Sequence, residues 1–207
     1  MNSDTDSTGR QYCILCQQQG RIWLQIGGRT MLRCPGCDFL WVKEGVSIAE
    51  DGKSIYESDT PIFLAEGNEA YYLDDTSAWS SQQKLDWVSG HICRGAELLD
   101  VGACFGHFLL AAKEKFHATG LEVSPVAAKW ATENLGVSIR VGCVHELGGV
   151  SAQYDAITFW DVIEHLTDPL DAIDRIRESL SHNGFLFLST PDAASFVATV
   201  LGRRWHY

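Results

Sequence analysis

The sequence predicts an α/β fold in which a doubly wound, mostly parallel sheet follows a small β-ribbon. From residue 96 onward, short apolar runs alternate with amphipathic stretches of helical period, which is typical of β-α-β units. Before residue 43, paired cysteines accompany short β-prone pieces that cannot build a large core. We therefore expect a ribbon over residues 1–42, a connector with helices over 43–94 and a ligand-binding domain over 95–207.

The composition limits where the protein acts and on what. It is 45% hydrophobic and 21% charged, which is ordinary for a soluble globular chain. The sequence lacks an apolar run long enough for a membrane span, and its polar start differs from a signal peptide. A formal charge of −11 disfavours a broad grip on nucleic acid. We expect a cytoplasmic protein with a small-molecule partner, no nucleic acid and no membrane; oligomeric state is left open.

Four cysteines in the ribbon have the spacing of a zinc site. Cys13 and Cys16 form one C-x2-C pair, Cys34 and Cys37 another, and 17 residues separate the pairs. Two tight turns at this spacing can present four thiolates to one Zn²⁺. A redox dithiol or four unrelated buried cysteines would leave the paired spacing unexplained. We predict structural zinc, between strands expected at residues 21–26, 30–33 and 39–42.

The elements after the ribbon follow from hydrophobic period. A helix over residues 79–93 would place Leu85, Val88 and Ile92 on one face. Strands are expected at residues 97–101, 117–122, 138–141, 156–160 and 184–190. Further helices are expected at residues 108–116, 125–135, 169–180 and 193–201. Asp168 and Pro169 mark the start of the helix at 169, because aspartate caps helices and proline suits their first turn.

The first strand of the sheet leads into a turn suited to a ligand. Asp100 precedes Gly102 and Gly106, and glycines let the backbone approach a ligand closely while the following helix offers free N–H groups to a carboxylate. About 20 residues later Glu122 ends the second strand, where an acidic side chain can accept hydrogen bonds from ribose hydroxyls. Cys104 and His107 replace two glycines of G-x-G-x-x-G, which disfavours a nicotinamide cofactor.

Ionisable residues follow the fourth strand of the expected sheet. Asp161, Glu164 and His165 would lie at its carboxyl end, where open α/β sheets bind ligands. Histidine, with an ordinary pKa of about 6.5, is a natural general base. We predict His165 as catalytic base with Glu164 as its orienting partner. The alternative is that both residues only bridge loops or cap the next helix.

These motifs resemble those of class I S-adenosylmethionine-dependent methyltransferases. Asp100, Gly102 and Gly106 match the family's first motif, acidic-x-Gly-x-Gly-x-Gly, with Cys104 in place of the middle glycine. The Glu164-His165 segment resembles a Glu-His motif that follows the fourth strand in many small-molecule methyltransferases. The resemblance covers roughly residues 85–191. With the ribbon in front, the chain looks like the zinc-ribbon subgroup that includes sugar C-methyltransferases.

The resemblance implies S-adenosylmethionine as cofactor and assigns residues to it. Asp100, Gly102 and Gly106 would hold its methionine end, and Glu122 its ribose. Cys143 and Val144 would lie near the adenine, with ordinary packing as an equal alternative, and Asp161 would border the cofactor. The acceptor would be a small molecule, with a nucleotide-linked sugar as one candidate.

The resemblance also implies a difference at the C-terminal side. The sheet of this family has seven strands, whereas the pattern here provides five, so we expect a Rossmann-like sheet that lacks its last two strands. A non-catalytic zinc-ribbon interaction module with a vestigial Rossmann-like domain is the main alternative function. A nicotinamide-dependent oxidoreductase is a more distant one.

Overall fold

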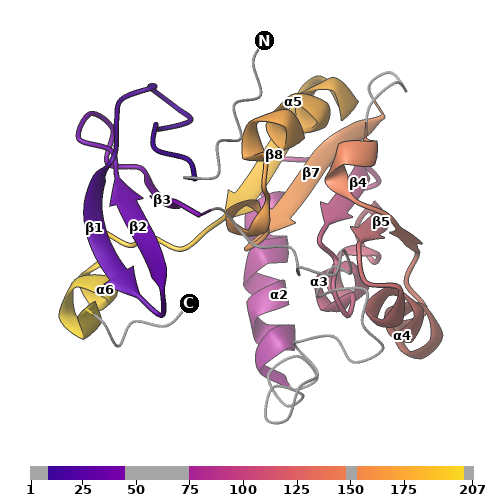
Figure 1. Cartoon of the computed structure of the whole chain (residues 1–207). Helices are drawn as coiled ribbons and strands as arrows, with labels where there is room; N and C mark the ends of the chain where they lie inside the picture. Colours follow the sequence, from indigo (N-terminus) through magenta and orange to yellow (C-terminus); the bar gives the residue numbers. More distant parts are fainter. Residues whose placement is uncertain (1–8, 45–74, 148–152, 203–207) are drawn as a thin grey trace. The chain divides into compact units, whose positions relative to one another are not determined.

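The computed structural model describes residues 9–44, 75–147 and 153–202, and it divides the chain into two compact units (Figure 1). One unit contains the ribbon together with the residues from 192 onward, and the other contains residues 51–191. Among the described residues, the helices are all too short or too polar to cross a membrane.

The ribbon is a three-stranded antiparallel sheet in the order β1-β2-β3. Its strands are β1 (Arg21–Ile26), β2 (Arg29–Arg33) and β3 (Leu40–Val42), close to the positions expected. Gly27 and Gly28 join β1 to β2 with φ angles of 56° and 78°. Two successive positive φ angles are what a two-residue hairpin turn requires.

The core of the ribbon is small. Its buried members are Cys13, Leu32, Cys34 and Trp41. The Phe39 ring stacks on Trp41 with 6.0 Å between centroids. A core of this size gives little hydrophobic stabilisation, so such units usually need a metal or disulfides.

The second unit holds a five-stranded sheet in the order β6-β5-β4-β7-β8, and every neighbouring pair is parallel. The strands are β4 (Glu97–Val101), β5 (His117–Glu122), β6 (Ile139–Val141), β7 (Tyr154–Trp160) and β8 (Leu180–Ser189). The chain first moves outward from β4 to β6 and then returns to β7 on the other side of β4. This reversal makes a switch point at the carboxyl ends of β4 and β7, where open α/β sheets bind ligands.

The helices are α2 (Asp75–Ser89), α3 (His107–Ala112), α4 (Pro125–Leu135), α5 (Pro169–Ser179) and α6 (Phe196–Leu201). Four of them differ in extent from the prediction, α5 only by ending one residue early at Ser179. Helix α2 starts and ends four residues early, α3 stops at Ala112 because the chain turns there, and α6 begins only after the capping residue Ser195. Asp168 caps α5 as expected, accepting a hydrogen bond from the Asp171 N–H at 3.1 Å.

The sheet is buried on both faces by different helices (Figure 1). Leu85 and Val88 of α2 and Phe108 of α3 pack with Leu98 of β4 on one face. The core on the other face contains Leu99, Val101, Ile157 and Phe159 of the strands with Ala172 and Ile176 of α5. Because side chains alternate along a strand, Asp100 shares the face of Leu98.

Candidate functional site

Two positions in the turn after β4 have a backbone conformation that only glycine adopts freely. Gly102 and Gly106 have φ angles of 76° and 75°. A Cβ atom at Gly102 would collide with a methyl group of Val162, and one at Gly106 would lie 2.9 Å from a methyl group of Val137. Both glycines predicted from the sequence are therefore required by conformation and by space.

Cys104 occupies the middle of this turn in a conformation that is unusual for a side-chain-bearing residue. Its φ angle is 48°, and its N–H donates to Glu122 Oε2 at 2.8 Å. The left-handed conformation costs about 1 kcal/mol or more outside glycine. The hydrogen bond to Glu122 offsets this strain and ties the turn to β5.

Glu122 lies at the end of β5 and is 5% exposed. Besides the Cys104 bond, its Oε1 accepts the Ser124 N–H at 2.8 Å. Burial raises the pKa of Glu122, and the backbone donors offset part of the rise. Each carboxylate oxygen has a second lone pair, so the group can still accept hydrogen bonds from a ligand.

Asp100 is buried in the sheet and is 2% exposed. Thr158 Oγ1 donates to its Oδ1 at 2.7 Å. Burial raises the pKa of Asp100 to about 7, although Thr158 and the charge of Lys84 act to lower it. Sequence reasoning missed Thr158, which lies opposite Asp100 in the register of β4 and β7.

Lys84 brings a positive charge to this acidic site from α2. Its Nζ lies 5.2 Å from the ring centroid of Trp160, the last residue of β7. The positive charge of Lys84 acts to lower the pKa of Asp100. The Trp160 Nε1 atom is buried and has no hydrogen-bond partner among the described residues. The sequence provided no signal for Lys84, because α2 carries no motif.

The carboxylates that follow β7 are held by hydroxyl groups from the end of β8. Asp161 Oδ1 accepts the Ser189 hydroxyl at 2.8 Å, and Glu164 Oε2 accepts the Thr190 hydroxyl at 3.2 Å. Glu164 Oε1 is buried and lacks a partner within the described residues. A buried carboxylate oxygen without a partner is a place where a ligand donor can bind.

His165 lies beside this group, in the short 3-10 helix η3 (Ile163–His165), and is exposed. In the part of the chain that the structure describes, its imidazole makes no hydrogen bond, and Glu164 bonds to Thr190 instead. The structure thus brings Glu164 and His165 to the expected edge without pairing them. Their catalytic role stays a prediction.

The residues predicted near adenine form the turn after β6, in the 3-10 helix η2 (Val144–Glu146). Gly142 N–H donates to the main-chain oxygen of Glu122 at 2.9 Å, so this turn starts beside the carboxyl end of β5. Val144 is 3% exposed and packs in the core, while Cys143 is half-buried. Val144 therefore fits the packing alternative as well as a cofactor wall.

Comparison with known proteins tests what this geometry suggests. A family described as a methyltransferase domain matches residues 74–207. The chain belongs to this methyltransferase family. Ubiquinone biosynthesis O-methyltransferase from Xanthomonas campestris pv. campestris (strain B100) is 32% identical over 133 residues, which cover 59% of this chain and 55% of that protein. The homologue from Xylella fastidiosa (strain 9a5c) is 30% identical over 59% of this chain and 54% of its own length.

Solved structures confirm the methyltransferase fold. A possible histamine N-methyltransferase from Thermotoga maritima aligns with a TM-score of 0.55 at 21% identity, covering 69% of this chain and 66% of that one. An S-adenosylmethionine-bound amino pentose methyltransferase from Micromonospora echinaspora aligns with a TM-score of 0.50 at 25% identity, covering 56% and 51%. The chain spans about half the length of the curated relatives it matches.

Outside the region that covers the methyltransferase domain, the four ribbon cysteines form a compact cluster. Their sulfur atoms all lie within 4.8 Å of one another. The Sγ atoms are 3.2 Å apart for Cys16 and Cys34, 3.6 Å for Cys13 and Cys37, and 3.7 Å for Cys16 and Cys37. A tetrahedral zinc with Zn–S bonds of about 2.3 Å separates its sulfur ligands by about 3.8 Å. The cluster is therefore compatible with a small zinc ribbon.

The two cysteine turns repeat the same backbone pattern. The N–H of Gln17 donates to the oxygen of Cys13 at 3.0 Å, and that of Asp38 to the oxygen of Cys34 at 3.1 Å. Gln17 and Asp38 both have a φ angle of 61°. In each turn an N–H two residues after the first cysteine points at its sulfur, at 3.4 Å. Such N–H groups stabilise thiolates, so the backbone suits metal ligands.

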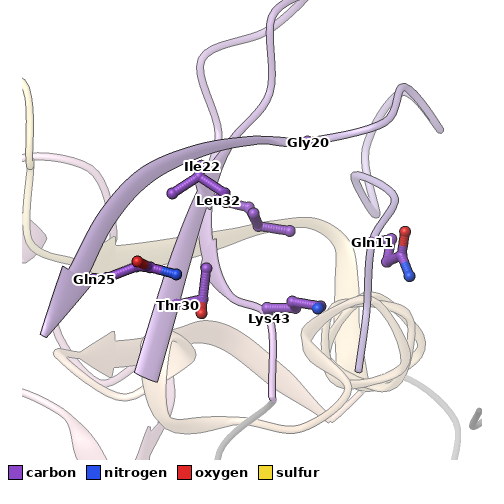
Figure 2. A pocket seen from close by; sticks show the side chains of 7 residues that line it. All are labelled: Gln11, Gly20, Ile22, Gln25, Thr30, Leu32 and Lys43. Atoms are coloured by element: carbon purple, nitrogen blue, oxygen red, sulfur yellow. The ribbon is translucent and has the colours of Figure 1, made fainter. Parts of the chain in front are cut away.

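The ribbon also carries an open hollow of roughly 230 Å³ beside β1 and β2 (Figure 2). Figure 2 shows the side chains of Gln25, Thr30 and Lys43 along it. None of the predicted site residues lines this hollow. It therefore does not help to identify the cofactor site of the methyltransferase domain.

Replacing Asp100 by asparagine should stabilise the ligand-free protein at neutral pH. The pKa is about 7 in the native state against an ordinary 3.8, so between these values the native state binds more protons than the unfolded state. The free energy of unfolding therefore falls as the pH rises through this window. Asparagine does not titrate and can still accept the Thr158 hydrogen bond. We expect Asp100→Asn to be more stable than the parent by roughly 2–4 kcal/mol at pH 8 and equally stable at pH 4.

Urea unfolding at both pH values measures this difference. Glu133→Gln, at an exposed position on α4, is the control for loss of a carboxylate and should change little. A less stable Asp100→Asn variant at pH 8 would contradict the prediction.

Proposed function

We propose that this chain is an S-adenosylmethionine-dependent methyltransferase that acts on a small-molecule acceptor. The supporting observation is the pair of buried carboxylates, Asp100 and Glu122, on either side of the glycine turn at the switch point of the sheet. The methyltransferase-domain match covers this region. The S-adenosylmethionine-bound neighbour supports the same cofactor.

The charges of the site complement those of the cofactor. S-adenosylmethionine carries a sulfonium, an ammonium and a carboxylate. Asp100 is the group assigned to the positive methionine end, and its raised pKa would fall when a cation binds beside it. Lys84 is the group assigned to the carboxylate. Glu122 is assigned to the ribose, because its oxygens retain free lone pairs.

The remaining predicted contacts complete the cofactor site. Gly102 and Gly106 shape the turn against the methionine end, Asp161 borders it, and Cys143 and Val144 lie on the adenine side. Methyl transfer is an in-line displacement, so the enzyme gains rate mainly by aligning the acceptor with the methyl group. A neutral acceptor atom must also lose a proton. We propose that His165 accepts this proton. Glu164 would accept a hydrogen bond from the methyl acceptor through its unpartnered oxygen, Oε1.

A nucleotide-linked sugar is the acceptor that we propose to test first. The zinc-ribbon resemblance supports it, and so does the amino pentose methyltransferase among the structural neighbours. The curated relatives are named for ubiquinone biosynthesis, so a phenolic acceptor is the comparison compound. Methylation of the phenol alone would overturn the sugar assignment and leave methyl transfer intact.

Calorimetric titration of the chain with S-adenosylmethionine, S-adenosylhomocysteine and NAD tests the cofactor. We expect micromolar dissociation constants for the two adenosyl ligands and no heat with NAD, because the turn lacks the glycines of the dinucleotide motif. No adenosyl binding by the folded chain would favour the non-catalytic interaction module.

Lys84→Met and decarboxylated S-adenosylmethionine together test the methionine end. The substitution should weaken S-adenosylmethionine roughly five- to tenfold, as expected for loss of a half-exposed charged hydrogen bond. It should change the affinity for the decarboxylated ligand much less, because that ligand has no carboxylate for Lys84 to bind and only the effect of Lys84 on the pKa of Asp100 remains. Lys129→Met, on the exposed face of α4, is the charge-matched control. Equal loss for both ligands would contradict the assignment.

His165→Ala should remove turnover while sparing the cofactor. General-base catalysis contributes about 100-fold or more to rate, so we expect a loss of that size in kcat. The dissociation constant of S-adenosylhomocysteine should stay within twofold, because His165 is not assigned to the cofactor. Steady-state kinetics and titration of the same preparation measure both. An unchanged kcat would end the assignment of His165 as base.

We also propose that the ribbon binds one structural Zn²⁺ through Cys13, Cys16, Cys34 and Cys37. Four protein ligands fill a tetrahedral site, so zinc bound there would stabilise the ribbon and have no open position for chemistry. The close sulfur atoms and the repeated turns support this proposal.

Metal analysis of the purified chain should find about one zinc per chain, and Cys34→Ser should lose it. Cys93→Ser is the matched control, because Cys93 is exposed and outside the cluster. Binding of S-adenosylhomocysteine should survive in Cys34→Ser, since the residues assigned to the cofactor lie in the other compact unit. Full zinc content in Cys34→Ser would contradict the four-cysteine site.

A further inference from the structure

Three polar side chains connect α5 to the turn after β6. Asp171 Oδ2 accepts His145 Nδ1–H at 2.6 Å and Arg175 Nε–H at 2.7 Å. Arg175 also donates from Nη1 to the main-chain oxygen of Leu147 at 3.1 Å. One arginine–aspartate pair on α5 thus holds the turn at two points, residues 145 and 147.

Apolar packing against α5 also holds this turn. Val144 and Leu147 are 3% and 5% exposed and belong to the core cluster that contains Ala172 and Ile176 of α5. The hydrogen bonds of Arg175 and then His145 hold the pKa of Asp171 below its ordinary value, so the group is charged at neutral pH. The three side chains are about one-third exposed, so solvent screens part of this attraction.

The turn held by these contacts lies beside the candidate cofactor site. Gly142 bonds to the main-chain oxygen of Glu122, so the turn starts at the carboxyl end of β5, beside the carboxylate assigned to ribose. A neighbouring ion pair on α5, Arg177 with Asp174 at 3.2 Å, is far more exposed and connects only residues of that helix. The Asp171–Arg175 pair therefore differs from an ordinary surface pair, because it connects α5 to the turn after β6.

We propose that Asp171 and Arg175 are positioning residues that fix the turn from Cys143 to Leu147 as the wall against the adenine ring. They touch neither cofactor nor acceptor, and they act by restricting the backbone that does. This inference rests on the proposed function, because it takes the turn as part of the adenosyl site. It predicts that affinity and discrimination between bases depend on a salt bridge on the far side of the turn.

The test compares Arg175→Met with Arg177→Met by titration with S-adenosylhomocysteine and S-inosylhomocysteine, which differ only in the base. Arg175→Met should weaken S-adenosylhomocysteine roughly three- to thirtyfold, as for residues that couple through a network. The preference for adenine over hypoxanthine should shrink, because a loosened wall discriminates less. Arg177→Met should bind both ligands like the parent.

A second variant and a ligand-free measurement separate positioning from loss of fold. Arg175→Lys keeps the charge beside Asp171 but replaces the two donor nitrogens that bond Asp171 and Leu147 with a single ammonium nitrogen, so we expect an intermediate affinity. Amide exchange in the absence of ligand should accelerate at Glu146 and Leu147, whose N–H groups close the turn on Cys143 and Val144. Faster exchange throughout the sheet would show general destabilisation and overturn the proposal.

The outcomes distinguish this inference from the proposed function. If the parent chain binds adenosyl ligands and Arg175→Met binds them with the same affinity and base preference, the positioning role is wrong and the methyltransferase assignment stands. If the parent binds no adenosyl ligand, the proposed function fails and the positioning role fails with it.

Discussion

The Glu122 carboxylate is the group on which the candidate site depends. Its oxygens accept the N–H groups of Cys104 and Ser124, so one side chain joins the glycine turn, the end of β5 and the start of α4. These bonds hold Cys104 in a strained conformation and align the turn with the switch point of the sheet. Loss of this carboxylate would release the turn as well as any contact with a ribose.

Burial of the two carboxylates of the site costs free energy when they are charged. Asp100 and Glu122 both have raised pKa values because burial disfavours their charged forms. The described residues bring one lysine, Lys84, close enough to lower the pKa of Asp100. A cation bound beside these carboxylates would stabilise their charged forms, so the site is suited to a sulfonium and an ammonium. The same electrostatics make Asp100 poor for stability and useful for binding.

The sequence predicted the sheet and brought out the main residues of the candidate site, whose roles stay predictions, because both depend on local patterns. The strand into Asp100, the glycines after it and Glu122 at the end of the next strand follow from apolar runs and turn residues. Thr158, Ser189 and Lys84 could not be found in this way. Each reaches the site through strand order or helix packing, which bring together residues far apart in the chain. The unpaired state of Glu164 and His165 also depends on Thr190, a residue from another strand end.

Backbone strain is concentrated at the two candidate sites. Within the part of the chain that the structure describes, four residues other than glycine have positive φ angles: Gln17, Asp38, Cys104 and Asp161. Two end the cysteine turns, and two lie at the carboxyl edge of the sheet. Such conformations persist only where surrounding contacts enforce them, and here each is enforced by hydrogen bonds from its own turn or from a neighbouring strand. The strain is therefore concentrated where the chain must aim thiolates and carboxylates, and it is absent from the described helices and strands that only build the core.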